Sequence, residues 1–340
     1  MTNALFKPVF SVVMPMYNVE AYVEQAITSV LEQSYPHFEL ICVDDGSTDS
    51  TAEIVSRFND PRIRYVHQKN RGLAGARNTG IGHSNGLYVA FLDSDDYWHP
   101  EKLYRHIEHF RTDPKLGCSY SASLFVDEQG VELGIGQHPK VKNISVKDIF
   151  CRNPIGNGSA PVIRRSLLIK TGRKTDFGDH YRMTYFDESL RQSEDIEYWL
   201  RLALSTGCKF EGLREGLTYY RVNASGLSAN LEKQYAAWEL CIEKNRALNP
   251  AFFQQWGSLA RAYQLRYLAR RAVQSGNKQQ ALKLVVDALK TDKRILKEEP
   301  GRTLITLACA CLLQLPGSVY RSLEKAGMQY FSQHNKMGKI

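Results

Sequence analysis

Three aspartates stand close together in the segment FLDSDDYW, residues 91–98. Carboxylates as close as Asp93, Asp95 and Asp96 repel one another unless a positive group lies beside them. Mg²⁺ and Mn²⁺ prefer hard oxygen ligands, and Mg²⁺ is usually held by one or two carboxylates together with substrate phosphates. Asp93 and Asp95 are therefore candidate metal ligands. The alternative is a polar turn that caps the helix expected from Pro100 onwards.

A second acidic segment, VDDGSTDS at residues 43–50, places Asp44 and Asp45 directly before Gly46. Glycine suits a tight turn, and the two carboxylates can accept hydrogen bonds from a nucleobase or a ribose. A turn followed by a helix N-cap explains the same residues without any ligand.

Other nucleotide-binding motifs are absent from the sequence. It contains no G-x-x-x-x-G-K-[ST] motif, and Gly80, Gly82 and Gly86 have the wrong spacing for G-x-G-x-x-G. These glycines also follow a helical pattern instead of a strand. The sequence therefore disfavours a P-loop and a dinucleotide-binding fold.

The elements that must position the carboxylates alternate between strand and helix. Apolar and β-branched runs predict strands, and helical spacing predicts helices, with Ser50 and Glu53 in capping-box spacing. The strands are expected at 8–15, 38–43, 63–68 and 87–92, and the helices at 19–33, 50–58 and 72–84. This order predicts an α/β fold with a mostly parallel sheet covered by helices on both faces. Ligands of such sheets bind beyond the carboxyl ends of the strands, where both acidic segments are expected to meet.

The second half of the chain divides into a mixed part and a helical part. We expect one catalytic domain over residues 1–227, with halves at about 1–114 and 115–227, and a helical region over 228–340. The net charge is +8, and the helical region holds 18 Lys and Arg against 8 Asp and Glu. Such a basic region indicates an anionic surface, such as a membrane face or a phosphorylated substrate, or else an ordinary solvated helical surface. Its charges are spread and show no nucleic-acid motif, so we expect no nucleic-acid partner.

One apolar segment, TLITLACACLLQL at 303–315, lies in the basic region. A membrane-spanning helix needs roughly 20 apolar residues, so this segment is either a core helix or a helix that lies in a membrane interface. The N-terminus lacks a signal-peptide pattern, and the seven cysteines show no framework spacing. We expect a cytoplasmic protein with peripheral contact, through 228–340, to the inner face of the plasma membrane.

Four motifs in a fixed order resemble a known family. They are SVVMPMYN, VDDGSTD, NRGLAGARNTGI and FLDSDDYW, and they resemble family 2 of the inverting glycosyltransferases, which has the GT-A fold. The resemblance covers about residues 8–225 and is closest in pattern to bacterial exopolysaccharide and lipopolysaccharide enzymes. It implies a nucleotide-sugar donor (a UDP-sugar is favoured), Mn²⁺ or Mg²⁺, and a saccharide or lipid-linked oligosaccharide acceptor. The QxxRW signature of the processive synthases is missing, which favours transfer of a single sugar.

The resemblance also implies roles for individual residues. The donor-nucleotide site would contain Pro15, Tyr17, Asn18, Asp44, Asp45, Arg77, Asp93 and Arg221. Asp95, together with Asp93, would hold the metal, which leaves Asp96 for the helix cap considered above. Glu194 and Asp195 match the acidic pair of the family, with Asp195 as the catalytic base. Ser225 or Ser228 would join Arg221 in the loop that closes over the diphosphate.

The implied chemistry needs a base on the acceptor side of the sugar. A helix dipole favours an ionised carboxylate at the helix N-terminus, so Asp195 is expected to be deprotonated at neutral pH. The alternatives are an acidic first turn without a function and a non-catalytic scaffold that binds nucleotide sugars at a membrane assembly site.

Overall fold

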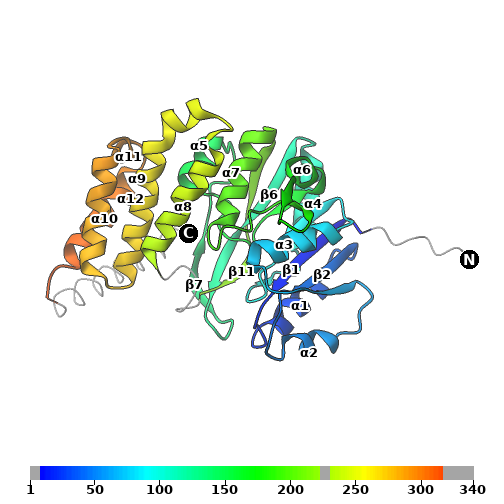
Figure 1. Cartoon of the computed structure of the whole chain (residues 1–340). Coiled ribbons are helices and arrows are strands. Elements are labelled where there is room, and N and C mark those ends of the chain that lie inside the picture. Colours follow the sequence, from blue (N-terminus) through cyan, green and yellow to red (C-terminus); the bar gives the residue numbers. More distant parts are fainter. Residues whose placement is uncertain (1–7, 223–229, 317–340) are drawn as a thin grey trace, which may run out of the picture. The chain divides into compact units, whose positions relative to one another are not determined.

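The computed structural model describes residues 8–222 and 230–316 and is drawn in Figure 1. The chain forms two compact units. The first extends to Asn230 and includes Ala236–Asn249, and the second comprises Leu231–Tyr235 and the chain from Pro250. Helix α8 (Leu231–Arg246) is thus divided between the units.

A nine-stranded sheet forms the centre of the first unit, in the order β3-β2-β1-β4-β8-β6-β11-β5, with β7 paired to β6. Its strands are β1 (Phe10–Met16), β2 (Phe38–Asp44), β3 (Ile63–His67), β4 (Tyr88–Phe91), β5 (Tyr97–Trp98), β6 (Leu116–Val126), β7 (Glu132–Gln137), β8 (Val162–Arg164) and β11 (Lys209–Arg221). Strands β1 to β4 are parallel to one another, and β11 is parallel to β6. Strand β8 runs antiparallel between β4 and β6. The predicted α/β fold is confirmed, but the sheet is mixed instead of mostly parallel: among the described residues, four of its strand pairs are parallel and four are antiparallel.

Helices pack on both faces of this sheet (Figure 1). Side chains alternate between the faces of a strand, so Val12 and Met14 of β1 enter one core and Val13 enters the other. The first core includes residues of α1 (Val23–Leu31), α2 (Thr51–Ser56) and α4 (Lys102–Thr112). The second includes residues of α3 (Gly72–His83), α5 (Val146–Arg152), α6 (Arg165–Thr171) and α7 (Glu194–Thr206).

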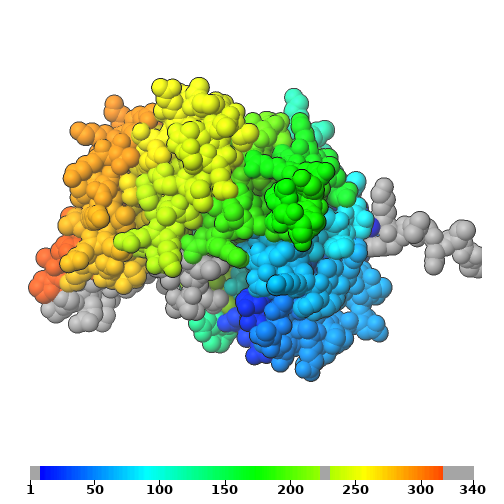
Figure 2. All heavy atoms as spheres, viewed as in Figure 1, coloured from blue at the N-terminus to red at the C-terminus, as the bar shows by residue number. Residues whose placement is uncertain are grey.

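A small separate hairpin precedes α7. It pairs β9 (Arg173–Asp176) with β10 (Tyr181–Thr184) in antiparallel fashion. Strand β10 lies beside α3, and Figure 2 shows the green atoms of this region directly against the light-blue atoms of α3. The hairpin therefore borders the part of the sheet that carries the acidic segments.

The start of α2 differs from the prediction. The Ser50 side chain forms no capping hydrogen bond, so the predicted capping box with Glu53 is wrong. The side chains at this helix start instead serve the loop after β1: Thr51 Oγ1 accepts from the Val19 N–H at 2.9 Å, and Asp49 accepts from the Glu20 N–H at 3.0 Å. The loop after β1 is thereby fixed beside the end of β2.

The second unit consists of helices. These are α9 (Pro250–Gln274), α10 (Lys278–Thr291), α11 (Arg294–Glu298) and α12 (Pro300–Leu312). The helical pattern of residues 267–292 predicts a helical hairpin with its turn at Gly276 and Asn277. The structure confirms it, because Gly276 has a φ of +71° and the Asn277 side chain caps α10.

The apolar segment 303–315 forms most of α12 and is only partly buried. Ala310 and Leu313 belong to the core between α9, α10 and α12, whereas Leu304 and Ile305 are 54% and 57% exposed. No helix within the described ranges has the length and hydropathy needed to cross a bilayer.

Candidate active site

The carboxyl ends of β1, β2 and β4 lie side by side because these strands are parallel neighbours. Tyr17 and Asn18 follow β1, and the Tyr17 side chain is 51% exposed. Asn18 has a φ of 51°, and its Oδ1 accepts from the Thr48 N–H at 2.8 Å. Pro15 is buried in β1, opposite Val43. A hydrogen bond therefore joins the loop after β1 to the loop after β2, and the Tyr17 ring is exposed to solvent.

Asp44 and Asp45 at the end of β2 are engaged inside the protein. Asp44 accepts from the Ser47 N–H at 2.8 Å and from the Tyr65 hydroxyl at 2.6 Å. Burial alone raises the pKa of Asp44, but these hydrogen bonds outweigh it and hold the pKa below its ordinary value. Asp44 thus stays ionised and shapes the turn.

Asp45 binds the start of α3. Its Oδ1 accepts from the Arg71 N–H at 2.9 Å, and its Oδ2 accepts from the Gly72 N–H at 2.8 Å. Burial raises the pKa of Asp45, partly opposed by its hydrogen bonds from Gln68 and Gly72. The structure brings Asp45 to the rim as predicted, but most of its hydrogen bonds already serve the loop that leads into α3.

Arg77 is the positive group beside the aspartates that follow β4. Its side chain is buried on α3, and its Nη2 donates to Asp93 Oδ1 at 2.7 Å while its Nη1 donates to Glu194 Oε1 at 2.6 Å. A planar guanidinium can serve two carboxylates through its two arms. Arg77 therefore joins the end of β4 to the start of α7, although Asp93 and Glu194 are far apart in the sequence.

Gly158 covers this ion pair, and sequence reasoning missed it. A Cβ at Gly158 would lie 2.3 Å from Arg77 Nη2 and 2.7 Å from Asp93 Oδ2, so only glycine fits there without displacement. The next residue supports the same loop, because Ser159 Oγ accepts from the Asp93 N–H at 3.0 Å. Neither residue belongs to a motif that the sequence alone brings to this site.

Asp96 does not cap α4, so that prediction is wrong. The residue before α4 is Glu101, and no side chain caps the helix. Asp96 is buried, accepting from Ser159 Oγ at 2.5 Å and from the Arg221 N–H at 2.9 Å. Burial, and then the charges of Asp95 and Asp93, raise the pKa of Asp96 well above its usual range. Asp96 therefore links the loop after β4 to Ser159 and Arg221.

Arg221, at the end of β11, binds the loop after β4 through its side chain. Its Nε donates to the Asp95 carbonyl at 2.8 Å, its Nη1 to the carbonyls of Asp127 and Glu128, and its Nη2 to Gln25 Oε1 at 2.7 Å. These four bonds leave at most one of its five N–H groups for a ligand. Ser225 and Ser228, predicted to act with Arg221, lie outside the described residues.

Asp95 and Asp93 are the carboxylates after β4 that could hold a divalent cation. Burial, and then the charge of Asp93, raise the pKa of Asp95 to about 6. A cation bound to the pair would offset this repulsion. In residues 8–222 and 230–316, no group of three or more His, Cys, Asp or Glu is arranged to hold a metal. Two carboxylates suit an ion that completes its coordination with substrate phosphates and water.

Asp195 lies in the first turn of α7, next to Glu194. It is half-buried, and its Oδ1 accepts from the Ile196 N–H at 2.7 Å. Burial, and then the charge of Glu194, raise the pKa of Asp195 to about 7, against the opposing effect of Arg77. The expectation that Asp195 is fully ionised at neutral pH is not met, because burial and the charge of Glu194 both raise its pKa. The carboxylate therefore titrates near neutral pH.

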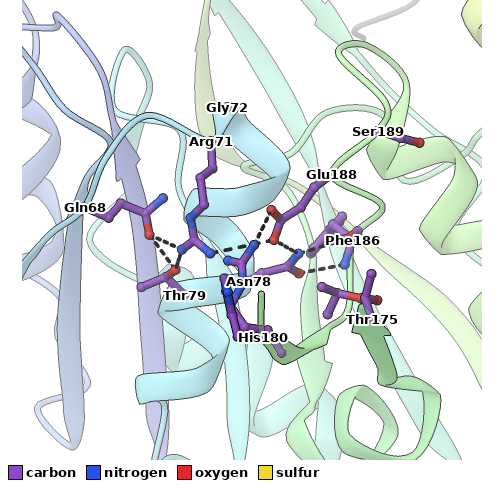
Figure 3. A network of polar contacts seen from close by, with 12 residues as sticks. Gln68, Arg71, Gly72, Asn78, Thr79, Thr175, His180, Phe186, Glu188 and Ser189 are labelled. Atoms are coloured by element: carbon purple, nitrogen blue, oxygen red, sulfur yellow. Dashed lines mark hydrogen bonds and ion pairs between the residues drawn. The ribbon is translucent and has the colours of Figure 1, made fainter. Parts of the chain in front are cut away.

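A second buried residue of α3, Asn78, contacts the segment before α7 (Figure 3). Its Oδ1 accepts from the N–H groups of Tyr185 and Phe186 at 2.9 and 2.8 Å. Its Nδ2 donates to the Phe186 carbonyl at 2.9 Å and to Glu188 Oε1 at 3.0 Å. Its position directly after Arg77 in the ARN motif is the only sequence signal for this role.

The mixed α/β sheet, with acidic loops at its rim and an acidic pair at a nearby helix start, matches the GT-A fold of solved glycosyltransferase structures. Residues 11–170 match the family described as Glycosyl transferase family 2. The chain is 34% identical over 233 residues to the putative teichuronic acid biosynthesis glycosyltransferase TuaG of Bacillus subtilis, covering 68% of this chain and 84% of TuaG. The chain belongs to glycosyl transferase family 2, and it is a glycosyltransferase.

Other relatives agree with this assignment. WfaP of Escherichia coli, a UDP-Glc:alpha-D-GlcNAc-diphosphoundecaprenol beta-1,3-glucosyltransferase, is 33% identical over 225 residues, 66% of this chain and 81% of WfaP. Residues 1–349 of Staphylococcus aureus TarS in complex with UDP-GlcNAc match with a TM-score of 0.58 and 20% identity, covering 94% of this chain and 91% of that one. The mannosyltransferase PcManGT of Pyrobaculum calidifontis, in complex with GDP-Man and Mn²⁺, matches with a TM-score of 0.57 and 21% identity, covering 91% and 87%. These two structures show the shared fold.

Proposed function

We propose that this chain is an inverting, metal-dependent glycosyltransferase that moves one sugar from a nucleotide-diphosphate sugar to a hydroxyl of a saccharide or lipid-linked acceptor. The observation that carries the proposal is the Arg77 bridge, which joins donor-side Asp93 to Glu194, the neighbour of the candidate base. The relatives support a UDP-sugar donor and a role in cell-surface polysaccharide biosynthesis, since WfaP is named for UDP-Glc and TuaG for teichuronic acid.

The residues of this chain supply the base and its setting. In an in-line displacement, Asp195 takes the proton of the acceptor hydroxyl while the acceptor oxygen bonds to the anomeric carbon and the bond to the diphosphate breaks. A pKa of about 7 suits a general base at neutral pH, because the best catalytic pKa lies near the operating pH. Glu194 is paired with Arg77, so it fixes the helix start and leaves Asp195 as the base.

The donor side is held by the rim of the sheet. Tyr17 presents an exposed aromatic ring that can stack on a base, and the loops around Asp44 and Asp45 form the wall beside it. A divalent cation held by Asp95 and Asp93 would neutralise the charge that develops on the departing diphosphate.

A donor screen by thermal unfolding tests this proposal. With Mn²⁺ and the correct nucleotide sugar at about 100 times its dissociation constant, the native state should gain about 2.7 kcal/mol, seen as a higher melting temperature. Asp95→Asn should lose most of this gain because it removes a ligand charge. Asp60→Asn is the matched control, since Asp60 pairs with Arg62 away from the rim. If no donor is hydrolysed or transferred and Asp95→Asn leaves nucleotide affinity unchanged, the proposal is wrong.

We also propose that the second unit makes peripheral contact with an anionic membrane surface from the cytoplasmic side, where a lipid-linked acceptor would lie. Its support is the basic charge of 228–340 and the exposed apolar side chains of Leu304 and Ile305 on α12.

Flotation of the full chain on anionic liposomes measures this contact. The double change Leu304→Gln and Ile305→Gln should lower the bound fraction by about tenfold or more, because each apolar side chain contributes on the order of 1 kcal/mol on burial. Ile169→Gln, an equally exposed apolar residue of the first unit, should have no effect. Equal flotation of all three proteins would exclude α12 as the contact.

A further inference from the structure

We propose that Asn78 is a positioning residue that fixes the segment 185–188 and thereby places Asp195 relative to the donor; this inference rests on the proposed function. Asn78 is only 3% exposed and lies on α3, whereas the segment 185–188 connects the β9–β10 hairpin to the loop before α7. Figure 3 shows the Asn78 amide directed at the backbone of this segment.

The Asn78 amide uses its full hydrogen-bonding capacity on this one segment. An amide has two N–H donors and two acceptor lone pairs. The donors reach the Phe186 carbonyl and Glu188 Oε1, and the acceptor receives the N–H groups of Tyr185 and Phe186, all within 3.0 Å. Contact with both backbone groups of Phe186 fixes the position of the chain as well as its distance from α3.

Glu188 ties the segment to its surroundings a second time. Its Oε2 accepts from Arg182 Nη2 at 3.1 Å, and its Oε1 lies 4.0 Å from Arg71 Nη1. Arg71 is in turn held by Gln68 and Thr79, as Figure 3 shows. The segment is thus attached to the loop that Asp45 organises at the donor side.

Through Arg77 and Asn78, helix α3 contacts both the donor side of the site and the segment that leads to Asp195. Consecutive residues of a helix point about 100° apart, so two neighbours can reach two different partners. Arg77 holds Asp93 and Glu194, and Asn78 holds the segment that leads to the same helix start. A displacement of about 1 Å between a base and its substrate can cost on the order of 10²-fold in rate. Asn78 therefore affects the reaction through Asp195 without touching either substrate.

The experiment compares Asn78→Ala with Gln33→Ala. Gln33 is also a buried amide with three hydrogen bonds to backbone, to the Ser29 and His99 carbonyls and from the Leu103 N–H, but it lies between α1 and α4. Asn78→Ala should lower kcat of transfer by about 10²-fold while nucleotide affinity stays within about twofold. Gln33→Ala should lower the melting temperature to a similar degree and leave kcat within about threefold.

Two further measurements separate positioning from general stability. Amide exchange at Tyr185 and Phe186 should accelerate by about tenfold or more in Asn78→Ala and stay unchanged in Gln33→Ala, because Asn78, and not Gln33, accepts hydrogen bonds from those N–H groups. Asn78→Asp, which places two carboxylates side by side, should be as slow as Asn78→Ala, and adding Glu188→Gln should restore part of kcat by reversing the polarity of that hydrogen bond.

The outcomes are distinguishable. Unchanged exchange at 185–186, or a kcat of Asn78→Ala within about threefold of wild type, overturns the positioning role. An equal loss of kcat in Gln33→Ala also overturns it. Failure of the wild-type protein to transfer from any donor contradicts the proposed function instead, and the exchange measurement still shows whether Asn78 holds the segment.

Discussion

Replacing Asp195 by asparagine is expected to lower the rate of glycosyl transfer by about 10²–10⁴-fold, the usual contribution of a general base. Asparagine has nearly the same shape and keeps an oxygen for the Ile196 N–H, so the fold should be preserved. Donor affinity should stay within about twofold, because Asp195 lies in the first turn of α7 and not at the ends of β1 and β2. Single-turnover transfer and nucleotide titration measure the two quantities.

The pH dependence of the transfer rate is a second test of this prediction, because the direction of the change is also predicted. Because the pKa of Asp195 is raised to about 7, its active, deprotonated form increases between about pH 6 and 8, and the transfer rate should rise with it. Glu194→Gln removes a negative charge that raises this pKa, so the rise should move to lower pH. Asp195→Asn should lack the rise altogether.

Asp179→Asn provides the control, since Asp179 is an exposed aspartate of the hairpin before α7. It should transfer at the wild-type rate with the wild-type pH profile. A rate for Asp195→Asn within tenfold of wild type would remove Asp195 from the mechanism. Biological activity that survives Asp195→Asn would favour the non-catalytic scaffold.

Replacing Arg77 by methionine is expected to destabilise the first unit by about 3–5 kcal/mol, the cost of breaking a buried ion pair from one side. Methionine fills much of the space but leaves Asp93 and Glu194 without their shared counter-charge. The free energy of unfolding from denaturant titration measures this loss.

Two other arginine variants test whether the loss of stability is specific to the Arg77 bridge. Arg77→Lys should recover only part of the stability, since an ammonium lacks the two-armed geometry that reaches both carboxylates. Arg62→Met removes a partly exposed pair with Asp60 and should cost no more than about 1 kcal/mol. Equal losses for Arg62→Met and Arg77→Met would contradict the central role assigned to the Arg77 bridge.

The sequence by itself determined the order and type of the elements that form the sheet. Apolar periodicity is a local property, so the four strands and three helices before residue 92 are present in the structure with ends shifted by a few residues. It also determined that the acidic segments after β2 and β4 share one rim, because parallel neighbouring strands end on the same side. The turn at Gly276 followed from local chemistry in the same way.

Only the tertiary structure decided which partner each side chain takes. Glu194 lies 117 residues from Arg77, the Asp96 carboxylate meets a backbone N–H 125 residues away, and Asn78 binds Phe186 at a distance of 108 residues. No local pattern specifies such pairs, since they depend on how helices pack against the sheet. For the same reason the sequence predicted a helix cap at Asp96, whereas packing buries this carboxylate against Ser159 and the Arg221 N–H. The charge that balances Asp93 within this chain is an arginine of α3, which only folding brings beside it.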